Sequence, residues 1–183
     1  VILHGEIYDE AYEHARQLEK AYGYTFVHPY EDPEVIAGQG TVGLEVLERV
    51  PDLDMIVIPI GGGGLISGIA TAIKGLRPQC KVIGVQSAQA PGMKELFKSE
   101  PTSHRSKRIS TIADGIAIKQ PSKTMHENFI SKLVDDVVTV SDDEIAEAIV
   151  YLLERAKAMT EGSGATAMAA LMNKKFQLAR KTC

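Results

Sequence analysis

Cysteine, tryptophan and long apolar runs are scarce or missing in this 183-residue sequence. It contains two cysteines, Cys80 and Cys183, and no tryptophan. Two cysteines so far apart do not form the framework of a disulfide-stabilised secreted domain, so we expect a reducing, cytoplasmic setting. No stretch approaches the roughly 18 apolar residues of a membrane-spanning helix, and the N-terminus lacks the basic start of a signal peptide. We therefore expect no membrane partner.

An excess of basic residues is also missing. The sequence has 20 Lys and Arg against 24 Asp and Glu, for a net charge of −4. Nucleic-acid binding requires a basic surface that neutralises phosphates, so we expect no nucleic-acid partner. The basic run at 104–108 has no aromatic residues around it, and we interpret it as a solvated loop. The remaining composition, 44% hydrophobic and 24% charged, is that of a globular domain with a core.

Apolar residues recur first at helix spacing and then at strand spacing along the whole chain. The expected helices cover residues 6–21, 33–49, 65–76, 122–133, 141–159 and 163–173, and the expected strands cover 24–27, 55–60, 81–85 and 136–140. This alternation predicts an α/β fold with a mostly parallel sheet flanked by helices. Gly38, Gly40 and Gly43 lie within one expected helix, which indicates close packing there more than approach of a ligand.

Three of the expected helices carry capping signals at their N-termini. Asp32 followed by Pro33 is typical of an N-cap and a first helical residue. Ser141 and Glu144 have the spacing of a capping box. Ser163 is the residue that we expect to cap the last helix.

The strongest local signal is the glycine loop I-P-I-G-G-G-G-L, in which a buried strand ends, four glycines follow and a helix begins. Glycine has no Cβ, so the backbone amides of Gly61 to Gly64 are free to approach an anion at the helix N-terminus. The loop is not a Walker motif, because no Gly-Lys-Ser/Thr follows. It is not a dinucleotide fingerprint, because no acidic residue ends the next expected strand, whose last residue, Val85, is followed by Gln86. A compact monophosphate therefore fits best.

Four motifs in a fixed order resemble a known family. They are D-P-E-V-I-A-G-Q-G-T at 32–41, G-G-G-G-L at 61–65, I-A-D-G at 112–115 and T-E-G-S-G-A at 160–165. Together they are similar to the threonine/serine dehydratase group of fold-type II pyridoxal-phosphate enzymes, which includes serine racemase. V-I-L-H-G, P-Y-x-D-P and V-I-G-V-Q-S add a closer likeness to the catabolic threonine dehydratases. The resemblance extends over the whole chain.

The resemblance implies pyridoxal 5'-phosphate as cofactor and assigns its contacts. The phosphate-binding amides are those of Gly61, Gly62, Gly63, Gly64 and Leu65. Gly115 would lie close to the pyridine ring, and Glu161 would lie near the ring and the active-site waters. From the residues alone, Glu161 is a helix N-terminal acid and Asp114 is a turn former, and both interpretations stay open.

Some motifs of the family are missing from this chain. We find neither the S-F-K-x-R-G-A-like motif with the Schiff-base lysine, nor the asparagine loop, nor the downstream S-G-G-N-like motif. The sequence also begins at Val1 without methionine. We therefore expect a piece of a longer enzyme, with 1–32 as the end of a small domain and 33–183 as most of the large cofactor-binding domain. No catalytic residue is assigned in this chain, and alone it should have no dehydratase activity.

The implied reaction is that of an ammonia-lyase in threonine catabolism or isoleucine biosynthesis. Such an enzyme converts L-threonine, and also L-serine, to a 2-oxo acid and ammonia, and the family associates as homodimers or homotetramers. One alternative is a serine racemase-like enzyme, although Gln86 and Gly92 stand where the racemases have the Glu and Asp of a cation site. A non-catalytic anion-binding fragment is another alternative. The five histidines are scattered without ligand spacing, so no metal site is expected.

Overall fold

The computed structural model describes residues 1–5, 8–101 and 109–177, so the basic run at 104–108 and Cys183 lie outside the described residues. Its centre is a parallel sheet with the strand order β1-β2-β3. The strands are β1 (Met55–Pro59), β2 (Lys81–Ser87) and β3 (Asp136–Val140). The α-helices are α1 (Tyr8–Tyr22), α2 (Pro33–Arg49), α3 (Gly64–Leu76), α4 (Gly92–Phe97), α5 (Lys123–Met125), α6 (Ser131–Leu133), α7 (Asp142–Tyr151) and α8 (Gly162–Met172). The expected α/β class is confirmed.

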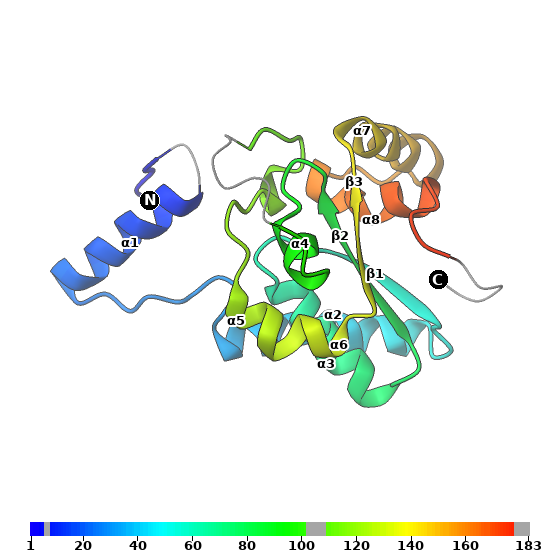
Figure 1. The fold of residues 1–183 in the computed structure, drawn as a ribbon, viewed down its shortest axis with the longest axis horizontal. Helices are drawn as coiled ribbons and strands as arrows, with labels where there is room; N and C mark the ends of the chain where they lie inside the picture. Colours follow the sequence, from blue (N-terminus) through cyan, green and yellow to red (C-terminus); the bar gives the residue numbers. More distant parts are fainter. Residues whose placement is uncertain (6–7, 102–108, 178–183) are drawn as a thin grey trace.

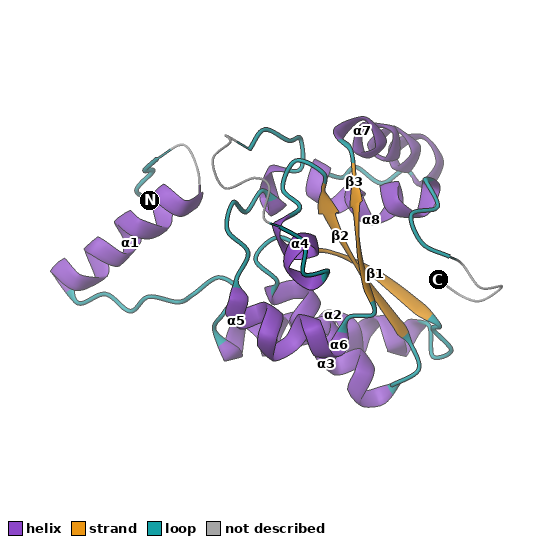
Figure 2. Ribbon diagram, in the orientation of Figure 1, coloured by secondary structure: helices purple, strands orange, loops and turns teal. Residues whose placement is uncertain are grey.

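Helices cover both faces of the sheet, so the domain has three layers (Figures 1 and 2). On one face α2 and α3 bury a cluster that includes Ile60, Ile66 and Ile73, all fully buried. On the other face α7 and α8 pack on a second cluster that includes Val85 and Ile145. Each fully buried aliphatic side chain of this size contributes about 1.5–3 kcal/mol, and the unbroken apolar pattern of β1 follows from burial on both faces.

The contact between α2 and α3 depends on glycine. A Cβ on Gly40 would lie 3.1 Å from the carbonyl oxygen of Gly68, and a Cβ on Gly43 would lie 3.2 Å from that of Ile69. A Cβ on Gly68 would lie 2.6 Å from the amide nitrogen of Gly40. The two helix backbones therefore touch, which confirms the packing interpretation for Gly40 and Gly43. For Gly38 it is wrong, since no atom lies within 4 Å of a Cβ there.

The N-terminal helix α1 stands apart from the three layers and is joined to α2 by an extended connection (Figure 1). Ring contacts hold this connection, with centroid distances of 5.5 Å for Tyr12–Phe26 and 4.5 Å for His28–Tyr30. The strand expected at 24–27 is wrong: within the described ranges no strand forms a ladder with it. Its apolar and β-branched residues satisfied the strand pattern, but a strand requires a hydrogen-bonded neighbour.

Two of the three helix starts agree with the sequence analysis. Asp32 Oδ1 accepts hydrogen bonds from the amides of Glu34 (2.8 Å) and Val35 (3.4 Å), with Pro33 as first helical residue. The capping box of α7 is complete: Ser141 Oγ accepts from the amide of Glu144 at 3.2 Å, and Glu144 Oε2 accepts from the amide of Ser141 at 2.8 Å.

The ends of the helices differ more from expectation. The helix expected over 141–159 ends earlier, because α7 passes into a π-helical turn, η3 (Leu152–Ala156), and Lys157 then takes a left-handed φ of +56°. The helix expected over 122–133 is present, with the π-helical turn η2 (His126–Ile130) between α5 and α6. Helix α4 was not expected. No helix in the described part of the chain is long and apolar enough to span a bilayer.

Candidate functional site

The glycine loop lies at the carboxyl end of β1, where ligands bind in open α/β sheets. Gly63 has a φ of +105°, a left-handed conformation that favours glycine, and α3 begins at the next residue. No side chain caps α3, and its first intrahelical bond runs from Ser67 N to the carbonyl oxygen of Gly63 at 3.0 Å. The amides of Gly64, Leu65 and Ile66 therefore have no partner within the helix and form the positive end of its dipole.

Tyr30, in the turn before α2, lies against this loop. A Cβ on Gly62 would overlap the ring of Tyr30, and a Cβ on Gly64 would lie 2.9 Å from the Cα atom of Tyr30. The glycines thus allow a second segment to approach the loop backbone. This contact could not be read from the sequence, because residues 30 and 62 belong to different motifs.

Three sequence motifs that are far apart in the chain meet at this edge of the sheet. A Cβ on Gly61 would lie 3.1 Å from the Cα atom of Ile116, at the end of the 3₁₀ turn η1 (Asp114–Ile116). A Cβ on Gly115 would lie 2.9 Å from Ser163 Oγ in the first turn of α8. The glycine loop, η1 and the N-terminus of α8 are therefore neighbours. Gly61, Gly115 and Glu161, which the sequence analysis grouped, come from these three segments.

Glu161 caps α8. Its Oε2 accepts a hydrogen bond from the amide of Ser163 at 2.7 Å, and its Oε1 accepts one from the amide of Gly164 at 2.6 Å. The expectation that Ser163 is the N-cap is wrong. Helix α8 begins one residue earlier because Gly162 packs on the backbone of the preceding segment: a Cβ on Gly162 would lie 3.0 Å from the amide nitrogen of Ala113. The interpretation of Glu161 as a helix N-terminal acid is confirmed.

Asp114 behaves as the turn former that we expected. Its Oδ1 accepts a hydrogen bond from the amide of Gly115 at 2.9 Å, and the side chain is exposed. This bond orients the peptide that leads into Gly115.

Gln86 has a structural function that the sequence analysis missed. It is only 2% exposed at the end of β2; its Nε2 donates to the carbonyl oxygen of Ile60 at 3.3 Å, and its Oε1 accepts from the amide of Lys94 at 2.9 Å. The amide group ties β2 to the residue before the glycine loop and to α4. The available signal for this function in the sequence was the position of Gln86, a polar residue directly after the apolar run of this strand.

Metal ligands do not gather at this edge. No group of three or more His, Cys, Asp or Glu side chains within residues 1–5, 8–101 and 109–177 could hold a metal ion. His28 instead accepts hydrogen bonds at Nδ1 from the amides of Tyr30 (3.3 Å) and Glu31 (3.0 Å). It shapes the turn that carries Tyr30.

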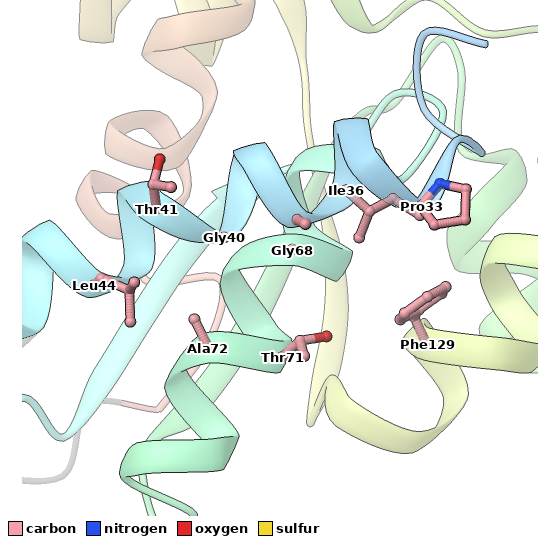
Figure 3. A pocket seen from close by; sticks show the side chains of 10 residues that line it. Pro33, Ile36, Gly40, Thr41, Leu44, Gly68, Thr71, Ala72 and Phe129 are labelled. Carbon is pink, nitrogen blue, oxygen red and sulfur yellow. The ribbon is translucent and has the colours of Figure 1, made fainter. Parts of the chain in front are cut away.

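An apolar cleft of about 340 Å³ lies between α2, α3 and Phe129 (Figure 3). Its only hydroxyl groups donate inside their own helices, from Thr41 to the carbonyl of Gly38 and from Thr71 to that of Ser67, both at 2.7 Å. The cleft has no charged lining residue. It therefore does not have the chemistry of an anion site.

The fold and the site together define an α/β protein with an uncapped helix N-terminus at the carboxyl edge of a parallel sheet. The chain belongs to the pyridoxal-phosphate dependent enzyme family, whose model matches residues 1–183. It is 49% identical over 177 residues to the L-threonine ammonia-lyase of Thermotoga maritima, covering 95% of this chain and 43% of that protein. It is 46% identical over 177 residues to the catabolic L-threonine dehydratase TdcB of Escherichia coli K12, covering 96% of this chain and 53% of that protein.

Solved structures agree with the fold. The maize serine racemase superimposes with a TM-score of 0.86 at 31% identity, covering 96% of this chain and 54% of that one. The chain spans about half the length of the curated relatives that it matches.

The residues of this chain fit the phosphate of the family's cofactor. The loop offers backbone amides at a helix N-terminus and no side chain that repels an anion. Two buried hydroxyl oxygens, Ser67 Oγ in the first turns of α3 and Ser163 Oγ in the first turn of α8, have no hydrogen-bond partner in the described structure. Unsatisfied buried polar atoms of this kind are rare in native proteins, and a bound ligand, ion or water is one explanation for them.

Proposed function

We propose that this chain forms the phosphate-anchoring part of a pyridoxal-phosphate dependent L-threonine ammonia-lyase that also accepts L-serine. The observation that carries the proposal is the uncapped N-terminus of α3, which follows four glycines at the carboxyl end of β1. The names of the relatives from Thermotoga maritima and Escherichia coli support threonine as the substrate.

In this proposal the glycines and Leu65 act through the backbone or the lack of a side chain, whereas Glu161 acts through its carboxylate. The amides of Gly61, Gly62, Gly63, Gly64 and Leu65 donate hydrogen bonds to the phosphate, and the helix dipole of α3 favours its charge. Gly115 has no Cβ, so a flat ring is able to lie against its backbone. Glu161 lies near the ring and the active-site waters while it caps α8.

When bound, the cofactor provides an electron sink for negative charge that develops at the substrate α-carbon. The residues of this chain contribute binding and orientation: they fix the phosphate and therefore the position of the ring. We assign the nucleophile and the base to parts of the protein outside this chain. Residues 1–32 then belong to a small domain and 33–183 to the large domain of a cytoplasmic homodimer or homotetramer.

The test compares two ligands that differ only in the phosphate. The protein expressed from its complete reading frame is stripped of cofactor and titrated with pyridoxal phosphate and with pyridoxal. We expect pyridoxal phosphate to bind at least about tenfold more tightly, because several charge-assisted hydrogen bonds are lost with the phosphate. The loaded protein should form 2-oxobutanoate from L-threonine. Equal binding of the two ligands, or no 2-oxobutanoate, contradicts the proposal.

A serine racemase-like enzyme is the second candidate, favoured by the structural likeness to the maize enzyme. The buried amide of Gln86, hydrogen-bonded to Ile60 and Lys94, stands where a racemase would have a carboxylate for its cation, and this opposes the assignment. Incubation with L-serine separates the two: pyruvate supports the ammonia-lyase, whereas D-serine as the main product supports the racemase.

A further inference from the structure

The Asp142 carboxylate, at the start of α7, binds a segment that leads to the candidate site. Its Oδ1 accepts a hydrogen bond from Thr111 Oγ1 at 2.5 Å, and its Oδ2 accepts one from the amide of Ile112 at 3.2 Å. The helix does not need this carboxylate as a cap, because Ser141 and Glu144 already form a complete capping box. The contacts of Asp142 are therefore directed to the segment before η1.

The Thr111 hydroxyl is saturated with hydrogen bonds. It gives its one proton to Asp142, so Ser87 Oγ must donate to it across their 2.9 Å contact, and the amide of Ala113 donates to it at 3.2 Å. Ser87 is fully buried at the end of β2. The network thus fastens residues 111–113 to both β2 and α7.

The opposite side of the same segment rests on α8. A Cβ on Gly162 would clash with the carbonyl of Ile112, so the backbone of Ile112 lies directly on the first residue of that helix. Its amide is held by Asp142 and its carbonyl by contact with Gly162. Three residues further on, Gly115 faces Ser163, and Ile116 touches Gly61. The position of Gly115 therefore depends on how residues 111–113 are held.

We propose that Asp142 is a positioning residue for the cofactor site: through Thr111 and Ile112 it fixes the segment that carries Gly115. The proposal rests on the function proposed above, because it assigns Gly115 to the surface on which the cofactor ring lies. Asp142 itself touches no ligand. Without its carboxylate the Thr111 hydroxyl and the Ile112 amide lose their acceptors, and Gly115 is no longer held against Ser163 at the start of α8.

The chain provides a matched control in Asp143, which is exposed and lies in the same first turn of α7. Asp142→Ala and Asp143→Ala remove the same charge from the same helix dipole, but only the first removes the contacts to Thr111 and Ile112. Both variants are made in the complete protein, stripped of cofactor and titrated with pyridoxal phosphate. Amide hydrogen exchange of residues 109–117 is measured on the same samples.

We expect Asp142→Ala to raise the dissociation constant for pyridoxal phosphate about tenfold, as is typical of losing a hydrogen bond to a charged group. The amides of Ile112 and Ala113 should exchange faster, and the circular-dichroism band of the bound cofactor should change. Asp143→Ala should stay within about twofold of the wild type, a small surface-charge effect. Asp142→Asn should be intermediate, since its amide has one acceptor oxygen.

A second pair of variants guards against a folding defect. Thr111→Val removes the hydroxyl while Thr111→Ser keeps it, so only the valine variant should weaken cofactor binding. The double variant Thr111→Val/Asp142→Ala should weaken cofactor binding by less than the sum of the two single effects in free energy, because both substitutions remove the same contact.

If Asp142→Ala and Asp143→Ala weaken cofactor binding equally, the inference is overturned, because the loss of negative charge near the N-terminus of α7 would then explain both effects. If the wild type binds pyridoxal phosphate and Asp142→Ala binds it equally well, the inference is also wrong while the proposed function stands. If the wild type binds no pyridoxal phosphate, the proposed function is wrong, and the inference fails with it.

Discussion

The ring of Tyr30 lies over the backbone of Gly62, in the space that any side chain at position 62 would occupy. Tyr30 is held in this place by its own turn: His28 Nδ1 accepts from the Tyr30 and Glu31 amides, and Ser122 Oγ donates to Glu31 Oε1 at 2.6 Å. The glycine loop thus has two functions that both require the absence of Cβ atoms. One is to present amides, and the other is to accept the turn before α2.

Gly62→Ala tests this relationship. The new methyl group overlaps the Tyr30 ring, so the loop or the turn must shift; we expect a loss of about 1–3 kcal/mol in the free energy of unfolding, as is typical of overpacking. The shift also moves the loop amides, so the dissociation constant for pyridoxal phosphate should rise more than about tenfold. Denaturant unfolding and cofactor titration of the complete protein measure the two effects.

The control for this variant is Gly38→Ala. Gly38 is exposed in α2 with no atom within 4 Å of a Cβ, so alanine should stabilise by about 0.5–1 kcal/mol and leave cofactor binding unchanged. Tyr30→Ala removes the obstacle, and in that background Gly62→Ala should cost much less. Equal costs of Gly62→Ala with and without the Tyr30 ring would show that the contact is not the cause.

The glycine pair within α3 gives an independent prediction about the core. Gly68→Ala places a methyl group against the backbone of α2, 2.6 Å from the Gly40 amide nitrogen, and neither helix backbone yields easily. We expect a loss of about 1–3 kcal/mol or more. Gly75→Ala, in the same helix, meets no atom within 4 Å and should stabilise by up to about 1 kcal/mol. The urea midpoints of the two variants measure both effects, provided that the denaturant slopes are unchanged. If both variants are destabilised or both are stabilised, close packing of α3 on α2 at Gly68 is not the cause.

Acid stability should depend on Glu144. Burial of this side chain disfavours its charged form, but hydrogen bonds from Lys175 (2.5 Å) and from the Ser141 amide outweigh burial and lower the pKa of Glu144. A carboxyl whose pKa is lower in the folded state stabilises the protein above its unfolded pKa, about 4.3, and loses this contribution as the pH falls through the folded value. Glu144→Gln should therefore be less stable than the wild type at pH 7. The difference in free energy of unfolding between the wild type and Glu144→Gln should shrink below about pH 4. A difference that grows as the pH falls would contradict this prediction.

Local signals in the sequence were sufficient for much of the fold. The apolar run of β1, the capping box at Ser141 and the Asp32–Pro33 start are written in neighbouring residues, and each appears where the pattern placed it. The family resemblance implied that Gly61, Gly115 and Glu161 lie near one cofactor, and Gly61, Gly115 and the start of α8 belong to segments that meet.

What the sequence did not reveal depends on partners far away in the chain. Residues 24–27 have strand composition, but a strand forms only where a neighbour supplies hydrogen bonds. Ser163 is the better intrinsic cap, yet the close approach of Gly162 to Ile112 moves the helix start, and Glu161 becomes the cap. The bond from Thr111 to Asp142 joins residues 31 positions apart, and no local pattern indicates it.

Glu161 combines a structural function that the geometry establishes with a cofactor function that we propose, and two substitutions separate them. Glu161→Ala removes the acceptor for the Ser163 and Gly164 amides and should cost about 1 kcal/mol of stability. Asparagine is one of the best N-cap residues, so Glu161→Asn should recover that stability to within about 0.5 kcal/mol. If the carboxylate also serves the bound cofactor, Glu161→Asn should still lower kcat for L-threonine at saturating pyridoxal phosphate, because the charge has been removed while the helix is intact. Unfolding curves and steady-state kinetics of the same preparations decide the matter. A Glu161→Asn enzyme with wild-type kcat would restrict Glu161 to capping α8.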